Sequence, residues 1–265
     1  MISFIFYTHS TRIENLNQSI YFLLRNEDKI DKEIIVIYQD KGPSINNIKT
    51  FNMNLSTYHK PKMCNYGVDK SKYEINCILD SDRLLPKNYF FNVLNNIKKN
   101  QMITTSFIIN LLHNCSNEDI INENFKYEVE HRSQNNELRR KNLFSGNTVF
   151  FKEDYIKIGK MDEQYEGYGY ADSDMNQTAI VHNIESIYLD IPEIHLFHNK
   201  GIFYKEQLLE DFQILSAINV IKYCIKWKIK SNIMHSVCRE VLNKLNLYSN
   251  EELKKDFVKL YKKIV

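Results

Sequence analysis

Three short apolar runs, separated by stretches of helical spacing, constrain the fold of this 265-residue chain more than any other feature. The runs are residues 2–7 (ISFIFY), 33–38 (EIIVIY) and 75–79 (INCIL). Each has the length and composition of a buried strand, and residues 102–110 form a further strand-like run. Helices are expected at residues 11–24, 62–70 and 86–99. This alternation predicts an α/β fold, with a mainly parallel sheet flanked by helices on both faces.

The second half of the chain changes character twice. Residues 111–142 are polar and are expected to form a partly helical loop over a cleft. The pattern then predicts strands at 143–152, 186–189 and 193–197, and helices at 153–159 and 172–182. From Tyr204 onward the pattern is helical to the end. We therefore expect a catalytic domain over residues 1–203 and a C-terminal helical extension over residues 204–265.

Composition excludes several classes of protein. A formal net charge of +2 argues against dedicated nucleic-acid binding. A hydrophobic fraction of 43% excludes a disordered chain. The five cysteines are scattered, without a CxxC pair, so neither a disulfide framework nor a zinc site is indicated, and a reducing cytoplasm is expected. There is no run of 18 apolar residues, so no helix is expected to span a membrane.

An acidic motif, Asp80-Ser81-Asp82, directly follows the third apolar run. Ligands of open α/β sheets bind at the carboxyl ends of strands. Carboxylates at this place suit a divalent cation such as Mg²⁺ or Mn²⁺, which takes oxygen ligands and bridges to phosphates. The alternative is a turn or a helix cap before Leu84.

The second candidate motif is a glycine-rich stretch at residues 167–174 (GYGYADSD). Glycine lets a ligand approach the backbone, and Tyr168 offers a flat face for a sugar ring. Asp172 stands at a helix start, where the helix dipole favours the ionised carboxylate that a general base needs. A glycine-rich turn with Asp172 as its N-cap is the alternative.

Two further groups of residues are candidates for ligand contacts. His195 and His198 lie three residues apart near a strand end, where either imidazole is a possible metal ligand and a structural histidine is the alternative. The lysines in residues 58–67 precede a helix and suit contacts to a diphosphate, although solvated lysines are common.

Taken in order, these motifs resemble the GT-A-fold glycosyltransferases, of the family-2 type joined to a galactosyltransferase-type C-terminal segment. The resemblance covers roughly residues 1 to 200. It is carried by Asn65-x-Gly67, Asp80-Ser81-Asp82, residues 144–147 (FSGN), residues 159–169 (GKMDEQYEGYG), Asp172-x-Asp174 and His195-x-x-His198. It implies a Rossmann-like GT-A fold and a nucleotide-sugar donor, expected to be a UDP-sugar.

The resemblance also implies a role for each matching residue. The nucleotide-sugar would contact Thr8, Arg12, Gln39, Asp40, Lys60, Lys62, Asp80, Ser81, Asp82, Ser145 and Gly146. The acceptor would contact Tyr168, Gly169 and Asp172, with Asp172 as the catalytic base. Mn²⁺ or Mg²⁺ would be held by Asp82 and His198, with His195 as a competitor and Asp80 as a further ligand. Ala171 stands where the family often has Glu, so the donor sugar stays open.

The expected reaction is metal-dependent transfer, with inversion, of a hexose or N-acetylhexosamine to a hydroxyl of a glycan, lipid-linked glycan or glycoprotein, as in bacterial polysaccharide biosynthesis. The alternatives are a sugar-phosphate nucleotidyltransferase and a non-catalytic nucleotide-sugar-binding module. The first would carry a glycine-rich loop after the first strand, and Thr8 to Arg12 contains no Gly.

The C-terminal segment from Tyr204 has twelve Lys and Arg against seven Asp and Glu. Its amphipathic helices are expected to pack on the catalytic domain or on a second subunit of a homo-oligomer, or to meet anionic lipid. The protein is thus expected in the cytoplasm, either free or bound at the inner face of the membrane.

Overall fold

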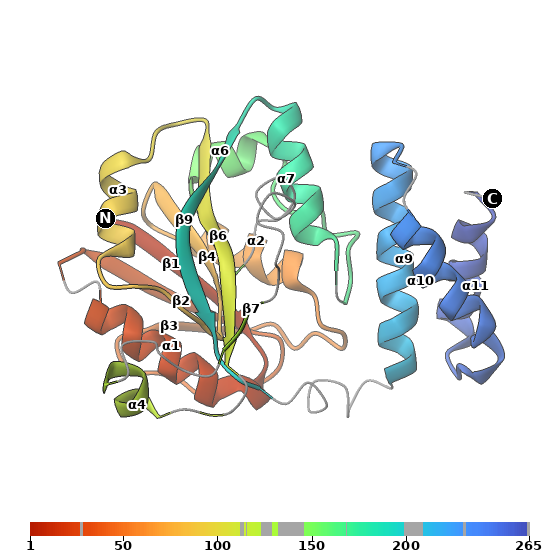
Figure 1. Cartoon of the computed structure of the whole chain (residues 1–265), viewed down its shortest axis with the longest axis horizontal. Helices are drawn as coiled ribbons and strands as arrows, with labels where there is room; N and C mark the ends of the chain where they lie inside the picture. The colour runs from red at the N-terminus through yellow and green to blue at the C-terminus, as the bar shows by residue number, and fades with distance from the viewer. Residues whose placement is uncertain are drawn as a thin grey trace.

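A computed structural model describes residues 1–26, 29–111, 114, 116–122, 129–131, 146–167, 169–198, 209–229 and 232–263. Within these residues the centre of the molecule is one mixed sheet of nine strands (Figure 1). The strand order is β3-β2-β1-β4-β8-β6-β9-β5, and β7 pairs with β6. Helices flank the sheet, and the three C-terminal helices stand together beside it. The expected α/β class is confirmed.

The strands alternate between two pairing modes. Parallel pairs join β1 to β2 and β4, β2 to β3, and β6 to β9, and they account for most of the paired residues. Antiparallel pairs join β4 to β8, β6 to β8 and β7, and β5 to β9. The strands are β1 (Ile2–Thr8), β2 (Lys32–Tyr38), β3 (Lys49–Asn52), β4 (Ile75–Asp80), β5 (Arg83–Leu84), β6 (Gln101–Leu111), β7 (Val129–His131), β8 (Asn147–Phe151) and β9 (Glu185–His195).

The helices lie close to their expected places, with one clear difference. The helix expected over residues 86–99 is confined to Tyr89–Asn96, because Asn88 has a left-handed backbone (φ 61°) that a continuous helix does not allow. The helical elements are η1 (Ser10–Arg12), α1 (Ile13–Asn26), α2 (Lys60–Lys70), α3 (Tyr89–Asn96), α4 (Asn117–Asn122), α6 (Lys152–Lys157), α7 (Ala171–Val181), α9 (Leu209–Trp227), α10 (Asn232–Asn243), η2 (Leu245–Leu247) and α11 (Glu251–Tyr261).

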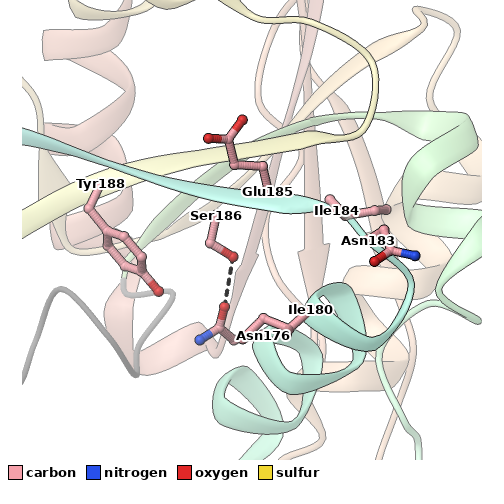
Figure 2. A pocket seen from close by; sticks show the side chains of 7 residues that line it. All are labelled: Asn176, Ile180, Asn183, Ile184, Glu185, Ser186 and Tyr188. Atoms are coloured by element: carbon pink, nitrogen blue, oxygen red, sulfur yellow. Dashed lines mark hydrogen bonds between the residues drawn. The ribbon is translucent and has the colours of Figure 1, made fainter.

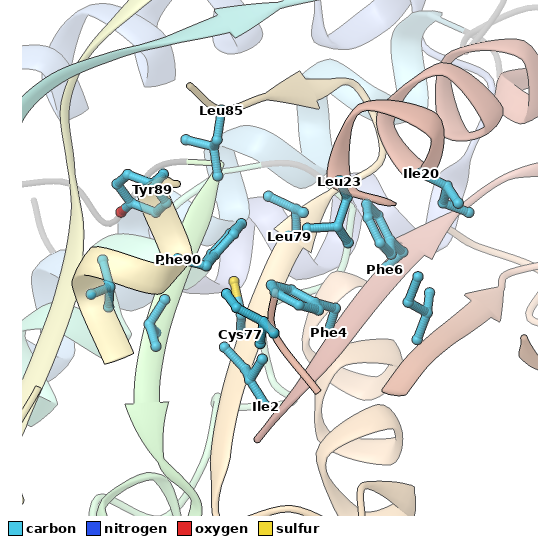
Figure 3. Packing of buried hydrophobic residues seen from close by; sticks show 14 of the residues in the cluster. Ile2, Phe4, Phe6, Ile20, Leu23, Cys77, Leu79, Leu85, Tyr89 and Phe90 are labelled. Carbon is cyan, nitrogen blue, oxygen red and sulfur yellow. The ribbon is translucent and has the colours of Figure 1, made fainter. Parts of the chain in front are cut away.

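The two faces of the sheet carry separate apolar cores, as the period-two pattern of β1 dictates. Phe4 and Phe6 point to the face covered by α1 and α3, where the rings of Phe4 and Phe90 meet edge to face with centroids 4.6 Å apart (Figure 3). Ile5 and Tyr7 point to the opposite face, which α2, α6 and α7 cover. Burial on both faces explains why the run is apolar except for Ser3, whose hydroxyl donates to the buried Glu33.

A third cluster of apolar side chains joins α9, α10 and α11 to one another. The described residues from Leu209 to Lys263 are helical apart from short connections, as expected. The proposed boundary at residue 203 lies in a stretch (199–208) outside the described residues, so the domain division stays a prediction. Among the residues described, no helix is long and apolar enough to cross a membrane.

The register of the central strands brings several loop residues to one edge of the sheet. Tyr7 pairs with Asp80, and Thr8 pairs with Tyr38, so β1, β2 and β4 end side by side. This is the edge at which α/β sheets bind ligands.

Candidate active site

The acidic motif lies at this edge and is tied to the end of β1. The Tyr7 hydroxyl donates to Asp80 Oδ1, and Thr8 Oγ1 donates to Ser81 Oγ at 3.0 Å. The hydroxyl of Ser19 in α1 also donates to the Ser81 carbonyl, at 3.0 Å. The motif is therefore not the helix cap that the sequence allowed, because α3 begins later, after Asn88.

The end of β2 holds the loop that follows β1. Asp40 accepts a hydrogen bond of 2.9 Å from the Ser10 amide and another from the Ser10 hydroxyl, and His9 Nε2 lies 3.4 Å from Asp40 Oδ2. The Gln39 amide donates to the Thr8 carbonyl at 2.9 Å. Thr8, Gln39 and Asp40, expected beside the nucleotide, thus lie together around one loop.

Asp82, His195 and His198 converge on one point. Nε2 of each histidine lies 3.3 Å from Asp82 Oδ2, and the two Nε2 atoms are 3.2 Å apart. One ligand atom from each of the three residues lies within 4.8 Å of the others. The structure therefore brings together both histidines, which sequence reasoning weighed as competitors.

The convergence has a simple backbone cause. The short strand β5 pairs with the end of β9, with Arg83 opposite His195, and the Leu196 amide donates to the Asp82 carbonyl at 2.9 Å. The Phe197 carbonyl is held in turn by Asn15 Nδ2 of α1 at 3.0 Å. The turn at Ser81 and Asp82 is thus joined to the end of β9 by backbone pairing.

The electrostatics suit a cation. Burial alone would raise the pKa of Asp82, but the two histidines and Arg83 outweigh burial and hold that pKa well below its usual range. Burial lowers the pKa of His195 to about 4. At neutral pH the triad therefore offers a carboxylate and a neutral imidazole, the protonation states in which both groups bind metals. Within the described residues, the buried Asp82 Oδ1 has no hydrogen-bond partner, so the donor set fits a divalent ion.

Two arginines stabilise the acidic groups. Arg12, expected to contact the nucleotide-sugar, donates from Nη1 to Oδ2 of the candidate metal ligand Asp82 at 2.7 Å. Arg83 Nε lies 3.5 Å from Asp80 and 3.4 Å from Asp82, and Arg83 Nη1 lies 3.4 Å from the buried Glu193. Burial, with the charges of Asp82 and other nearby carboxylates, raises the pKa of Asp80 well above its usual range, although Arg83 opposes this.

Gly146 packs against the buried ion pair of Arg83 and Glu193. Its carbonyl accepts a hydrogen bond of 2.7 Å from the Asp80 amide, and its φ is +59°. A Cβ at this position would overlap Glu193 Oε1 and lie 2.8 Å from Arg83 Nε. Ser145, the other residue expected near the donor sugar, lies outside the described residues.

Asp172 lies opposite the acidic motif, in the first turn of α7. Lys60 Nζ lies 2.8 and 2.9 Å from its two carboxylate oxygens and 3.6 Å from Asp80 Oδ1. Asp172 is not the N-cap of α7; that residue is Tyr170, without a side-chain cap. The side chain of Asp172 is one-third exposed, so its carboxylate is accessible for chemistry.

The contact between Lys60 and Asp172 depends on the glycine-rich stretch. The Gly167 amide donates to the Tyr58 carbonyl at 2.8 Å, and Gly167 forms a parallel bridge with His59. Lys62, in the first turn of α2, is half-buried one position beyond Pro61. Of the residues expected to bind the acceptor, Gly169 is described with φ +94°, and Tyr168 lies outside the described residues.

An open groove of about 500 Å³ lies elsewhere on the molecule, between the second half of α7 and the start of β9 (Figure 2). Asn176 Oδ1 accepts from Ser186 Oγ there at 2.8 Å, and Tyr188 also lines the groove. Because β9 begins here and ends at His195, the groove is at the opposite edge of the sheet from the triad. It contains none of the residues expected to form the site.

Comparison with known proteins identifies the architecture. A family model described as the N-terminal domain of galactosyltransferase matches residues 126–200, less than a third of the chain. Among curated proteins, none matches the sequence. The fold is similar to that of Staphylococcus aureus TarS in complex with UDP-GlcNAc, with a TM-score of 0.58, 11% identity, and coverage of 98% of this chain and 79% of that one. The chain has a GT-A fold.

Two further GT-A structures show the same likeness. PcManGT, a mannosyltransferase from Pyrobaculum calidifontis in complex with GDP-Man and Mn²⁺, has a TM-score of 0.54 and 13% identity over 98% of this chain and 73% of that one. GalNAc-T7 with UDP, GalNAc and Mn²⁺ has a TM-score of 0.56 and 12% identity over 76% of this chain and 44% of that one. This chain thus spans less than half of the GalNAc-T7 chain. At these identities the likeness is one of fold.

Sequence reasoning missed Arg83 and Glu193 in this candidate site. Arg83 directly follows the acidic motif, and Glu193 is fully buried in β9. A charged residue inside a strand of a buried sheet requires a partner, which is the signal that could have identified Glu193. The partner itself is 110 positions away in the chain and is not readable from the sequence.

Proposed function

We propose that this protein is a metal-dependent glycosyltransferase, which transfers a hexose or N-acetylhexosamine from a nucleotide-sugar to a hydroxyl of a glycan, lipid-linked glycan or glycoprotein. The observation that carries the proposal is the convergence of Asp82, His195 and His198 at the strand edge, opposite the accessible carboxylate of Asp172. The nucleotide-sugars and Mn²⁺ bound in the similar GT-A structures support it.

The ligand set favours Mn²⁺ over Mg²⁺. Two of the three candidate ligand atoms are imidazole nitrogens, whereas Mg²⁺ is bound through oxygen ligands and water. A cation held by Asp82, His195 and His198 would supply positive charge to balance the charge that develops on the leaving diphosphate. Asp80 is a further carboxylate close to the triad, and it would contact the ribose or bind the cation.

Asp172 is proposed as the general base. Its carboxylate takes the proton of the acceptor hydroxyl while the hydroxyl oxygen forms a bond to the anomeric carbon. The bond from that carbon to the diphosphate oxygen breaks, and the nucleoside diphosphate leaves with the bonding electrons. A single base and a single displacement imply inversion at the anomeric carbon. Lys60, in contact with both Asp172 and Asp80, links the base to the donor side of the site.

The decisive experiment separates binding from turnover. Asp172→Asn should lower transfer and donor hydrolysis by about 10² to 10⁴-fold, the usual contribution of a positioned base, and leave the affinity for UDP and Mn²⁺ unchanged in calorimetry. Asp82→Asn should abolish Mn²⁺-dependent binding. Asp256→Asn, an exposed change of the same kind on α11, is the control. An Asp172→Asn variant that keeps wild-type turnover contradicts the assignment of the base.

A screen of donors distinguishes the candidate functions. UDP-sugars and GDP-mannose should be incubated with Mn²⁺, because UDP-GlcNAc and GDP-Man are bound in similar structures. A glycosyltransferase releases the nucleoside diphosphate and the sugar. A nucleotidyltransferase would act only when pyrophosphate is added, and would convert the donor into a nucleoside triphosphate and a sugar 1-phosphate. A binding module would leave the donor unchanged.

Cellular location is a second part of the proposal. The cysteines that the structure describes (Cys64, Cys77, Cys224 and Cys238) are buried free thiols, which supports a reducing cytoplasm. The proposed contact with the inner leaflet of a membrane rests on the excess of Lys and Arg in the C-terminal segment, because α11 exposes Lys255 and Lys259 together with Glu252 and Asp256. Salt-sensitive co-sedimentation with phosphatidylserine vesicles would support membrane contact. Concentration-dependent mass in light scattering would instead support a homo-oligomer.

A further inference from the structure

Helix α9 contacts the segment that carries Asp172. We refer to residues 162–167 and 169–174 as the glycine loop. Lys222 Nζ donates to the Gln164 carbonyl at 2.7 Å, and Asn219 Nδ2 donates to the Glu166 carbonyl at 2.7 Å. Lys226 Nζ lies 2.9 Å from Asp162 Oδ2. Residues 219, 222 and 226 are spaced by three and four positions, so one face of α9 is directed at the loop.

Asp174 is the centre of this contact. It is 1% exposed and lies two positions after Asp172, in the same first turn of α7. Its carboxylate accepts hydrogen bonds from Lys226 Nζ at 2.8 Å, Trp227 Nε1 at 2.8 Å and the Tyr165 hydroxyl at 3.2 Å. A buried carboxylate is strongly disfavoured without such donors, so Asp174 fixes the start of α7 against α9.

Close backbone approach reinforces the contact. Gly167 and Gly169 have φ values of +73° and +94°, which favour glycine. A Cβ on Gly167 would lie 3.2 Å from Leu215 Cδ1, and one on Gly169 would lie 3.7 Å from Ser216 Oγ. The Tyr58 carbonyl holds the other side of Gly167. The glycine loop is thus clamped between α9 and the segment that precedes α2.

We infer that Asp174, Lys226 and Trp227 are positioning residues for the base, and that the C-terminal helices thereby complete the active site. The inference rests on the proposed function, because it concerns how Asp172 is held. Lys226 joins the two ends of the glycine loop, Asp162 and Asp174, and Trp227 fixes the second oxygen of Asp174. The hydrogen bonds from Lys226 and Trp227 thus fix the first turn of α7, and with it the position of Asp172 relative to Lys60.

The test uses the full chain and three variants. Lys226→Met removes the donor to both carboxylates, Lys226→Arg restores a cation, and Trp227→Phe removes a single N–H while keeping an aromatic ring. Lys255→Met, an exposed lysine on α11, is the matched control. A displaced catalytic group lowers turnover by about 10²-fold, so kcat should fall by that factor in Lys226→Met. The donor KM and the affinity for UDP and Mn²⁺ should be unchanged, and Lys226→Arg should recover most of the activity.

A second measurement does not depend on activity. Hydrogen–deuterium exchange of amides in the glycine loop and the first turn of α7 should rise in Lys226→Met and stay at wild-type values in Lys255→Met. Unchanged exchange overturns the inference, as does wild-type kcat in the Lys226→Met variant. If Lys226→Met does not fold, Trp227→Phe decides between the same two outcomes. A wild-type chain that binds UDP and Mn²⁺ yet neither transfers nor hydrolyses any sugar contradicts the proposed function instead.

Discussion

Replacement of Gly146 by Ala tests the buried charge pair behind the acidic motif. The added Cβ would overlap Glu193 Oε1 and lie 2.8 Å from Arg83 Nε, and Glu193 is fully buried. Neither group has a way to move into solvent, so the pair must shift. Because Arg83 contacts Asp80 and Asp82, the shift is transmitted to the motif that is proposed to hold the donor.

Gly159→Ala provides the reference for the size of the effect. Gly159 also has a positive φ, +83°, but a Cβ there would have nothing within 4 Å. Its substitution thus costs only the left-handed backbone strain, about 1–2 kcal/mol. Gly146→Ala pays the same strain plus the cost of overpacking a closed site, typically a further 1–3 kcal/mol. Both variants should remain folded, since domains of this kind have about 5–15 kcal/mol of stability.

Urea unfolding and calorimetry with UDP and Mn²⁺ give the two readouts. Gly146→Ala should be less stable than Gly159→Ala, and it alone should bind the nucleotide more weakly. Equal losses of stability in the two variants, with nucleotide affinity unaffected, would refute the reasoning. The close contact of Gly146 with Arg83 and Glu193 would then contribute nothing to the free energy of unfolding.

Three further predictions concern other residues. His195→Ala and His198→Ala should each weaken Mn²⁺ binding by at least about ten-fold in calorimetry, since both imidazoles face Asp82; a loss confined to one variant would identify the single histidine ligand. Burial alone would raise the pKa of Glu33, but hydrogen bonds from Lys49, the Lys72 amide and Ser3 outweigh burial and hold that pKa below 4.5. Glu33 therefore stabilises the fold above pH 4.5, and this stabilisation is lost as the pH falls below the lowered pKa. The difference in unfolding free energy between wild type and Glu33→Gln should therefore shrink in acid; a difference that is constant with pH would exclude this origin. Lys255→Glu should lower co-sedimentation with anionic vesicles if α11 meets the membrane, and an unchanged bound fraction would argue for another surface.

The central fold is predictable from the sequence because strands buried on both faces consist mostly of apolar residues. This holds for β1, β2 and β4, whose apolar runs contain few polar residues, such as Ser3, Glu33 and Asn76. The last strand is different: two short strands are predicted at 186–189 and 193–197, whereas β9 is one strand from Glu185 to His195. Pairing with β6 resumes at Pro192 after an irregularity next to Thr105, so a break in the local pattern is not a break in the sheet.

The candidate site is predictable only in part. Residues that follow the ends of β1, β2 and β4 are expected together because parallel strands end at one edge. The supporting residues are not, because their partners are remote: Arg83 with Glu193, and Asp174 with Lys226. A buried charge in the sequence indicates that a partner exists, and only the packing of α9 and β9 shows which residue it is.

The two histidines show most clearly what local pattern leaves undecided. At a spacing of three residues, an extended strand places the side chains of positions 195 and 198 on opposite faces, which would allow only one of them to reach Asp82. The strand β9, however, ends at His195, and just beyond it the Leu196 amide donates to the Asp82 carbonyl. Outside the strand the side chains no longer alternate, and Nε2 of His198 lies 3.3 Å from Asp82 Oδ2, as does Nε2 of His195. The choice between one histidine and two is therefore made by the point at which β9 ends. At that point, His195, its pairing with both β6 and the two-residue strand β5 stops, and β5 has almost no signature of its own in the sequence.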